Sequence, residues 1–518
     1  MSSAQGSGAI GIGGGFLSSL YKRGVRLWAE DGRLRFQAPK GALASEDLDK
    51  LRAFRAEIIE LIGQMEFASN IPLQPRPAGC QVPLTATQLL AWNGIQKSDE
   101  KLSIRFCTIG VRIFGPLNAQ LLKESIDALV RRHESLRTRI VALEGTPVQQ
   151  VDPAAGGQLQ LVDFGAVSAA HVEEDVGRLA QEFIDEKVDL AVGPVFAAKL
   201  FRLSDNEHVL ILAIEHLFCD GVSMEILGRE VWALYDRAIR GLPLVLPQLP
   251  VQFADYAVWQ QKTYDVWEET HATYWKEHLQ GAPCLRLPRD EGLVEAKNPT
   301  GTVFQLLLEN SLSVRLREVA RRERTLPALV LLTIYVAVMS RWHEQGDLVV
   351  GFASNGRYRP ELRDMVGLLV DGMHLRIKVS EDDTFLHLLG RVKEEFQHAC
   401  EHPQFGHVQD IIIPEGSSDF SLSFNWQPTS WMLWFASGGW QFNDQIRVQS
   451  FPLNRVWVAE FHPLFYDTGE GIGLAVTYRQ DFLRAATVER FASELRSFAA
   501  KCAEDVFARV ASISMKRA

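Results

Sequence analysis

One short segment of the sequence combines residue types that can do acid–base chemistry. Glu215, His216, Asp220 and Gly221 lie at the end of an apolar stretch that runs from His208 to Phe218. A histidine at a strand end can project its imidazole into a cleft, where its usual pKa near 6.5 suits proton transfer at neutral pH. Asp220 can fix the turn through an arginine, and Gly221 lets a backbone N–H approach an oxyanion. A structural histidine with satisfied hydrogen bonds is the alternative interpretation.

Strands and helices alternate around this segment. We expect an apolar strand near Ile104 to Phe114, a helix from Asn118 followed by a strand pair, and a hairpin whose strands are Phe196 to Leu203 and His208 to Phe218. That hairpin leads through a short loop into a helix that begins near Val222. The second half repeats the alternation with a helix at Leu326, a strand at 348–352 and a closing helix at 487–504. This pattern predicts a mixed α/β fold.

The sequence holds no Gly-Lys phosphate loop, no Gly-x-Ser-x-Gly elbow, no His-Glu-x-x-His and no dinucleotide glycine fingerprint after a strand. The six cysteines contain no Cys-x-x-Cys pair, which argues against a zinc site and a disulfide framework. We therefore expect no metal, and cysteines that are reduced and mostly serve packing. They are Cys80, Cys107, Cys219, Cys284, Cys400 and Cys502.

The composition is typical of a soluble globular protein of several domains. The chain has 518 residues, of which 47% are hydrophobic and 23% charged, and its net charge is -10. An acidic protein has no general attraction for phosphate backbones, so we expect no nucleic-acid partner. The longest apolar run, from Leu326 to Met339, is too short to span a membrane, and the N-terminus lacks a secretory signal. These features predict a cytoplasmic protein that does not bind membranes.

The N-terminal region reads as a small module of helix, hairpin and helix. Residues 25 to 38 alternate as two strands around Asp31-Gly32, which supplies a tight turn. Between Tyr21 and Lys40, six basic residues face two acidic ones, a local net charge of +4 on an acidic protein. A solvated face is one interpretation, and strand addition of an acidic peptide to the hairpin edge is the other.

Changes in composition divide the chain. A glycine-rich lead-in occupies residues 1–15, the small module 16–65, and a proline-rich linker 66–83, because proline neither continues a helix nor donates to a sheet.

The segment around His216 resembles the His-His-x-x-x-Asp-Gly signature of nonribosomal peptide synthetase condensation domains, which are relatives of chloramphenicol acetyltransferase. Other stretches resemble further motifs in the family's order, at 84–88, 132–138, 253–260 and 366–372. The resemblance covers residues 84 to about 508. It implies a two-lobed, V-shaped fold with an N-lobe at 84–265, a C-lobe at 266–510 and a tail at 511–518.

The resemblance implies that His216 is the base that takes or positions the proton of an amine or hydroxyl as it attacks a carrier-bound acyl thioester. Arg357 is the expected partner of Asp220, and Asn425 should lie on a strand that lines the site. The implied partners are acyl or peptidyl carrier proteins, whose phosphopantetheine carries the substrate, and a free or carrier-bound acceptor. No cofactor is expected on the chain itself. Since no carrier or adenylation domain follows, we expect a free-standing or excised condensation enzyme.

Three departures from the family pattern keep other functions open. Glu215 replaces the first motif histidine, Asp371-Gly372 stand where the family usually has Asn-Thr, and the sixth motif near His402 is degraded. A catalytically degenerate domain that recruits a partner enzyme is one alternative. Epimerisation or dehydration, to which similar domains are adapted, is another.

The small module resembles the TubC-type N-terminal docking domain, especially at 24–28 and 38–43. The resemblance implies that it binds the C-terminal tail of an upstream synthase. The residues expected to bind this peptide are Lys22, Arg23, Arg26, Trp28, Arg33, Arg35 and Lys40.

Overall fold

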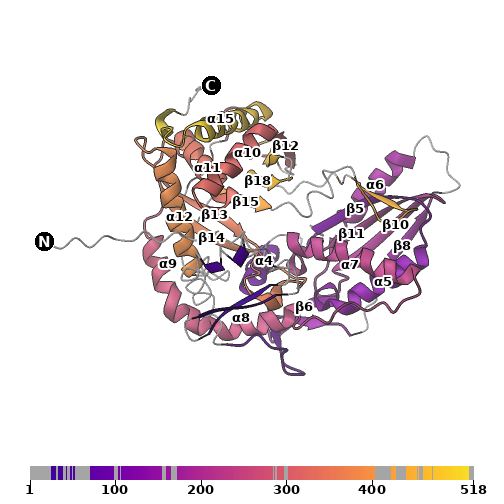
Figure 1. Cartoon of the computed structure of the whole chain (residues 1–518). Helices are drawn as coiled ribbons and strands as arrows, with labels where there is room; N and C mark the ends of the chain where they lie inside the picture. Colours follow the sequence, from indigo (N-terminus) through magenta and orange to yellow (C-terminus); the bar gives the residue numbers. More distant parts are fainter. Residues whose placement is uncertain are drawn as a thin grey trace.

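The computed structural model has two lobes that lie side by side, each built on a six-stranded sheet with helices against it (Figure 1). It describes residues 71–97, 107–153, 159–164, 172–296, 301–402, 422–427, 439–451, 459–468 and 471–512, a few positions excepted, and short pieces elsewhere. The two-lobed, mixed α/β architecture expected from the sequence is confirmed.

The N-lobe sheet has the strand order β16-β17-β5-β11-β10-β8. Its early strands are β5 (Cys107–Phe114), β8 (Leu159–Asp163), β10 (Phe196–Ser204) and β11 (Glu207–Ile214), and its helices are α5 (Ala119–Arg132), α6 (Val172–Ile184) and α7 (Gly221–Ile239). Asn118 caps α5, because its Oδ1 accepts the N–H groups of Gln120 and Leu121 at 3.1 Å each. The hairpin of β10 and β11 and both helix starts lie where the sequence predicted them, within one residue for α7.

Two strands of this sheet come from the C-terminal half of the chain. β17 (Arg447–Ser450) pairs with β5, and β16 (Trp440–Gln441) pairs with β17, so late strands lie among early ones in Figure 1. Val448 of β17 and Ile446, which directly precedes β17, are buried in the N-lobe core. The boundary that assigned all of 266–510 to the C-lobe is therefore wrong for residues 440–450, because burial of these side chains needs the N-lobe.

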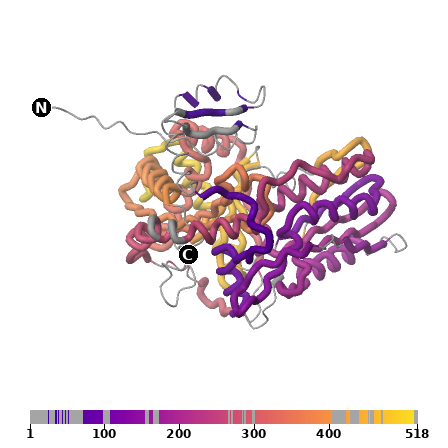
Figure 2. Tube along the Cα trace, turned by 90° about the horizontal axis from the view of Figure 1, so that it is seen from below, coloured from indigo at the N-terminus to yellow at the C-terminus, as the bar shows by residue number. Residues whose placement is uncertain are grey.

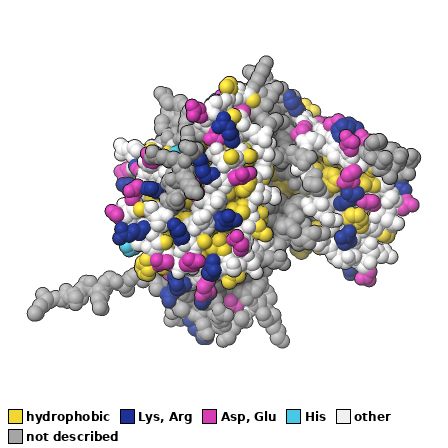
Figure 3. Space-filling model, turned by 90° about the horizontal axis from the view of Figure 1, so that it is seen from above, with side chains coloured by type: hydrophobic (Ala, Val, Ile, Leu, Met, Phe, Trp, Pro, Cys, Tyr) yellow, Lys and Arg dark blue, Asp and Glu magenta, His cyan; other side chains and the backbone are white. Residues whose placement is uncertain are grey.

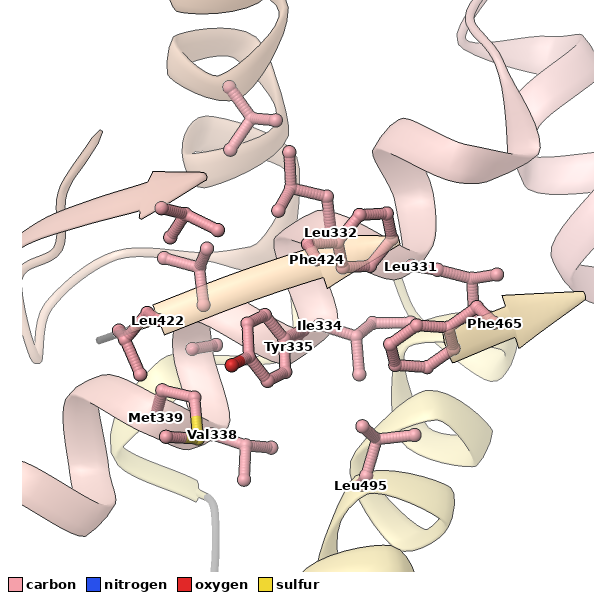
Figure 4. Close-up of a cluster of buried hydrophobic side chains, with 14 of the residues drawn as sticks. Leu331, Leu332, Ile334, Tyr335, Val338, Met339, Leu422, Phe424, Phe465 and Leu495 are labelled. Carbon is pink, nitrogen blue, oxygen red and sulfur yellow. The ribbon is translucent and has the colours of Figure 1, made fainter. Parts of the chain in front are cut away.

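The C-lobe sheet has the order β12-β19-β18-β15-β13-β14. The strands are β12 (Gly301–Leu307), β13 (Asp347–Ser354), β14 (Asp371–Lys378), β15 (Leu422–Gln427), β18 (Phe461–Asp467) and β19 (Ile472–Arg479). The helices are α10 (Asn310–Arg322), α11 (Pro327–His343), α12 (Phe385–Glu401) and α15 (Ala485–Glu504). Phe424 of β15 points into the core, where its ring lies 5.9 Å from Tyr335 of α11 and 4.9 Å from Phe465 of β18 (Figure 4). Ser423 and Asn425 alternate with it and belong to the other face of the sheet.

The apolar run seen in the sequence forms α11, which is buried along residues Ala328 to Ser340. A helix that is apolar on all sides belongs in a core. Within the described residues, no single helix is long and apolar enough to cross a membrane, and only the bent pair α10 and α11 passes that test by length and composition.

The proline-rich segment packs against the lobes from residue 71 onward. Trp259 donates its indole N–H to the Ile71 carbonyl at 2.6 Å, and Arg76 pairs with Asp255 of α8 (Phe253–Trp267) at 2.7 Å. β3 (Val82–Pro83) pairs with β7 (Thr146–Val151), which pairs with β6 (Thr138–Leu143). Residues 71–83 therefore belong to the large domain, and the predicted linker at 66–83 was too long, because apolar residues such as the buried Leu73 hold it in place.

The remaining described elements connect these parts. They are α4 (Ala86–Lys97), β4 (Ser103–Ile104), β9 (Lys187–Val188), α9 (Thr273–His278), a π-helix at Glu268–Ala272 and 3₁₀ turns at Glu134–Arg137, His216–Phe218, Pro360–Leu362 and Val510–Ser512. The last turn is bound to the C-lobe, since the N–H of Val510 donates to the Asp383 carbonyl at 2.9 Å. The expected tail at 511–518 thus begins at least two residues too early.

The predicted N-terminal hairpin is present. β1 (Arg26–Glu30) pairs with β2 (Arg33–Gln37), with Glu30 opposite Arg33, as a two-residue Asp31-Gly32 turn requires. Figure 2 shows the pair as a small unit at the edge of the molecule. The lead-in at 1–15, the first flanking helix and most of the second lie outside the described residues, as do Lys22, Arg23 and Lys40.

The charged residues are mixed on the face seen from above. Acidic and basic side chains are interspersed over both lobes there, with apolar side chains between them (Figure 3).

The loop that follows β13 depends on a glycine. Gly356 has φ +65°, and an added Cβ would lie 1.7 Å from the Leu369 carbonyl oxygen. We expect Gly356→Ala to lower the free energy of unfolding by at least about 2 kcal/mol, through the backbone strain and the clash. Gly390→Ala is the control, because nothing lies within 4 Å of its Cβ position in α12, and it should stabilise the protein by about 0.5–1 kcal/mol. Urea unfolding measures both, and equal midpoints for Gly356→Ala and wild type would contradict the expectation.

Candidate active site

The segment from Glu215 to Gly221 forms a tight turn between β11 and α7. β11 ends at Ile214, a 3₁₀ turn covers His216–Phe218, and α7 begins at Gly221. The sequence extended the strand to Phe218, because Leu217 and Phe218 continue its apolar run, and this was wrong. These two side chains instead pack beneath the turn in a separate small cluster.

His216 is the one exposed residue between His208 and Asp220. Its Nδ1 lies 2.6 Å from the Cys219 carbonyl oxygen. A carbonyl oxygen only accepts, so Nδ1 carries the proton of this hydrogen bond. In the neutral ring, Nε2 is then the atom with a free lone pair, and it can accept a proton from a substrate.

Asp220 is completely buried and surrounded by donors. Its Oδ1 accepts the N–H and hydroxyl of Ser223 at 2.8 Å each and Nη2 of Arg357 at 2.9 Å. Its Oδ2 accepts Nη1 of Arg357 at 2.9 Å and the N–H groups of Leu369 and Val370 at 3.0 and 3.2 Å. Burial by itself raises the pKa of Asp220, but Arg357 and Ser223 outweigh it and lower the pKa.

This network ties three distant segments together. Arg357 also donates to the hydroxyl of Ser223 and to the Met365 carbonyl, both at 3.0 Å. Ser223 bonds to the backbone of Gly367, whose Cβ position is filled by the ring of Phe253 at 2.2 Å. The structure thus pairs Arg357 with Asp220, as the sequence suggested, and fixes the start of α7 against the segment 365–370.

Glu215 has a structural role at the start of the turn. It is fully buried and caps the 3₁₀ turn by accepting the N–H of Leu217 at 3.4 Å. Gly221 begins α7, and an added Cβ there would meet only Gln427 Nε2 at 3.6 Å. The space around Gly221 therefore does not by itself demand a glycine.

The C-lobe candidates lie on two strands. Asn425 is on β15, on the sheet face opposite the core, and Gln427 at the end of the same strand approaches Gly221. Asp371 is the first residue of β14 and is partly buried. The structure thus brings the end of β15 to the beginning of α7.

Of the other motifs, the first contacts the turn and the second packs against α7. Gln88 of α4 donates its side-chain N–H to the Leu217 carbonyl at 2.8 Å, and it exchanges hydrogen bonds with Thr85 as a capping box. The second motif packs elsewhere: buried His133 lies 2.7 Å from Glu230 of α7. Burial lowers the pKa of His133 despite this carboxylate. These residues therefore have structural partners and leave His216 as the exposed histidine of the turn.

Sequence reasoning missed two residues of the site. Ser223 could have been found as the third residue of α7, because the side chain of a capping aspartate accepts a backbone N–H two or three residues later. Cys107 was expected to serve packing, but it lies at the turn, where its thiol donates to the Cys219 carbonyl at 3.5 Å. No local pattern links it to His216. Among the described residues, no cluster of three or more His, Cys, Asp or Glu side chains suits a metal ion.

Removing Asp220 should destabilise the protein. In Asp220→Ala the buried guanidinium of Arg357 loses its partner, so we expect a loss of about 3–5 kcal/mol in the free energy of unfolding. Asp364→Ala removes the exposed partner of Arg229, a pair at 2.8 Å, and should cost less than about 1 kcal/mol. Chemical unfolding compares the two, and equal losses would contradict the account.

The same pair sets a pH dependence. Because folding lowers the pKa of Asp220, its contribution to stability is complete above the pKa of the unfolded chain. That contribution disappears as the pH falls through the lower folded-state value. The difference in stability between wild type and Asp220→Ala should therefore shrink in acid.

The chain is similar to parts of several known synthases. One of the linear gramicidin synthase proteins of Brevibacillus parabrevis is 29% identical over 447 residues, which are 84% of this chain and 8% of that protein. Chondramide synthase cmdD of Chondromyces crocatus is 27% identical over 468 residues, 86% of this chain and 11% of that protein. The chain thus spans about a tenth of the length of these relatives.

Solved structures share the fold. The X-domain from teicoplanin biosynthesis superposes with a TM-score of 0.73 at 23% identity, covering 86% of this chain and 99% of that one. The first condensation domain of the calcium-dependent antibiotic synthetase gives 0.68 at 18% identity, covering 85% and 100%. The family model for the condensation domain matches residues 80–517, and the TubC N-terminal docking domain matches 15–64. The chain therefore belongs to the condensation-domain family of nonribosomal peptide synthetases, with a TubC-type docking domain at its N-terminus.

Proposed function

We propose that the chain transfers an acyl group from the phosphopantetheine thioester of a carrier protein to an amine or hydroxyl, giving an amide or ester. The exposed ring of His216, whose Nδ1 is tied to the Cys219 carbonyl, carries this proposal. The thioester already supplies the activation, so the chain needs no cofactor of its own. Holding donor and acceptor together lowers the barrier further.

In the proposed reaction, the ring of His216 carries the proton from the nucleophile to the leaving group. The nucleophile forms a bond to the thioester carbon while Nε2 of His216 takes its proton. When the C–S bond breaks, the proton passes to the leaving phosphopantetheine sulfur. Asp220 and Gly221 act by holding the turn, and we propose that Asn425 and Asp371 contact the acceptor. The free thiols Cys107 and Cys219 favour a reducing compartment, and we propose the cytoplasm.

Recruitment of a partner enzyme without chemistry is a second candidate. A solved X-domain with the same fold was found in a complex with OxyB. The departures at Glu215 and at Asp371-Gly372 also favour this candidate. Retention of His216 and of the complete set of hydrogen bonds around Asp220 favours acyl transfer instead.

His216→Ala tests the function. The ring is exposed, so its loss should leave the unfolding temperature within a few degrees while transfer falls by about 10²–10⁴-fold. His387→Ala removes an exposed histidine on α12 and should change neither quantity. Mass spectrometry of the loaded carrier follows transfer. Full transfer by a folded His216→Ala variant would reject the general-base role of His216 and favour positioning of the reactants by other groups.

For the docking module, we propose that an acidic C-terminal tail of an upstream synthase adds as a strand to the hairpin of β1 and β2. Arg35 and Phe36 on β2 are exposed, and Phe36 is 46% exposed. Arg26, Trp28 and Arg33 lie on the same two strands. Extended backbone at a sheet edge supplies the hydrogen bonds, and the basic residues add a salt-sensitive attraction.

Calorimetry with a synthetic acidic tail peptide and the full chain tests docking. We expect micromolar binding that weakens several-fold in Arg35→Glu and in high salt. Arg178→Glu makes the same charge change on exposed α6 and should leave binding unchanged. If the peptide failed to bind in low salt, or if both variants bound it equally, docking through this hairpin would be wrong.

A further inference from the structure

A serine and a histidine form a hydrogen-bonded pair on the C-lobe sheet. Oγ of Ser423 on β15 lies 3.0 Å from Nδ1 of His462 on β18. In the parallel pairing of these strands Asn425 stands opposite Leu464, which places Ser423 beside His462 two residues earlier on each strand. Side chains at every second position share a face. The pair therefore lies on the face opposite that of Phe424, whose ring points into the core (Figure 4).

The face that carries the pair leads to the catalytic turn. Gln427, the last residue of β15, belongs to it, and its Nε2 lies 3.6 Å from the position of a Cβ added to Gly221. Ser423 is four residues earlier on the same strand, which corresponds to about 13 Å along extended chain. Asn425 lies halfway between them. A molecule held at the turn can thus reach the pair only with a long side chain that passes over Asn425.

Small residues leave room beside the pair. Gly351 of β13 stands opposite Ser423, and among the described residues an added Cβ there would meet only the Leu422 carbonyl oxygen at 3.7 Å. Two residues later, Ala353 stands opposite Gly372 of β14, where no described atom lies within 4 Å of an added Cβ. Glycine inside a strand often marks a place where another molecule approaches the backbone closely. This part of the face therefore has space for a substrate group.

The pair presents hydrogen-bonding groups without a charge. Burial lowers the pKa of His462 to about 4, so its ring is neutral near pH 7. The hydroxyl of Ser423 has one donor and two acceptor positions, and Nδ1 of His462 uses one of them. A hydroxyl on a substrate can both donate and accept, so it can bond to Ser423 whichever atom of the pair holds the shared proton. A carboxylate or an ammonium group would find no balancing charge in the pair.

We propose that Ser423 and His462 are specificity-determining residues, which bind an uncharged hydroxyl group at the far end of the acceptor while its nucleophile reacts beside His216. The proposal rests on the proposed acyl transfer, in which Asn425 contacts the acceptor. Because Asn425 lies between the turn and the pair, the acceptor that touches it is the substrate that continues toward Ser423. The pair only binds this group, so no bond of Ser423 or His462 forms or breaks.

Transfer to three matched pairs of amines tests the proposal. They are benzylamine, phenethylamine and 3-phenylpropylamine, each with and without a para hydroxyl, so that the hydroxyl stands at three distances from the amine. In wild type, the hydroxylated member of at least one pair should have a kcat/KM higher by about ten-fold or more. In Ser423→Ala this ratio should approach one, because the hydroxyl has lost its partner. A merely structural loss would lower transfer to both members alike and leave the ratio unchanged.

Two further variants complete the experiment. His462→Asn should retain part of the preference, since the asparagine amide can replace Nδ1 as the partner of Ser423. Ser497→Ala removes an exposed hydroxyl on α15 and should keep the wild-type ratio. A wild-type ratio below about two-fold in all three pairs, or the same ratio in Ser423→Ala, would overturn the proposal. So would a loss of preference in Ser423→Ala that concerns hydroxylated acyl chains and leaves the acceptors unaffected.

A binding measurement separates this proposal from the proposed function. Titration of the full chain with tyramine and with phenethylamine, followed by NMR of the ligands, requires neither a carrier nor transfer. Tyramine should bind more tightly to wild type by several-fold and lose this advantage in Ser423→Ala. If wild type transfers no acyl group but shows this difference, the proposed function fails and the subsite stands. If transfer occurs but neither binding nor kcat/KM depends on the hydroxyl, the subsite fails alone.

Discussion

A buried carboxylate governs the arrangement of this site. Asp220 has no exposed surface, and a charge removed from water is tolerated only when donors surround it. The chain supplies them from Ser223, Arg357 and the backbone of 369–370, which belong to both halves of the sequence. Satisfying one carboxylate thus fixes the start of α7, the loop after β13 and the segment before β14 against one another.

The position of His216 is a consequence of that constraint. Asp220 caps α7, and the turn before it is held by Glu215 and by Gln88 from α4. Every residue from His208 to Asp220 except His216 is buried as a result. The ring alone is left facing solvent, with one nitrogen committed to the Cys219 carbonyl. Rigid surroundings and one free nitrogen are what a positioned base requires.

Sequence patterns predicted the caps, turns and helix starts that depend on residues close together in the chain. The cap at Asn118, the hairpin of β10 and β11 and the start of α7 follow from local signals, and the family motif suggested Arg357 for Asp220. The end of β11 was missed because Leu217 and Phe218 look like strand residues. The pairing of β16 and β17 with the N-lobe sheet and the contact of Cys107 with the Cys219 carbonyl depend on the folded chain, since these partners are distant in sequence.

The central claim is that His216, held by the Asp220 network, moves an acyl group between two reactants. Intact-mass measurement of an acyl-loaded carrier protein, incubated with this chain and a panel of amine and hydroxyl acceptors, tests it most directly. The account predicts that with at least one acceptor the carrier loses the acyl mass while an amide or ester of matching mass appears. A carrier that stays loaded with every acceptor, or that only hydrolyses, would contradict it.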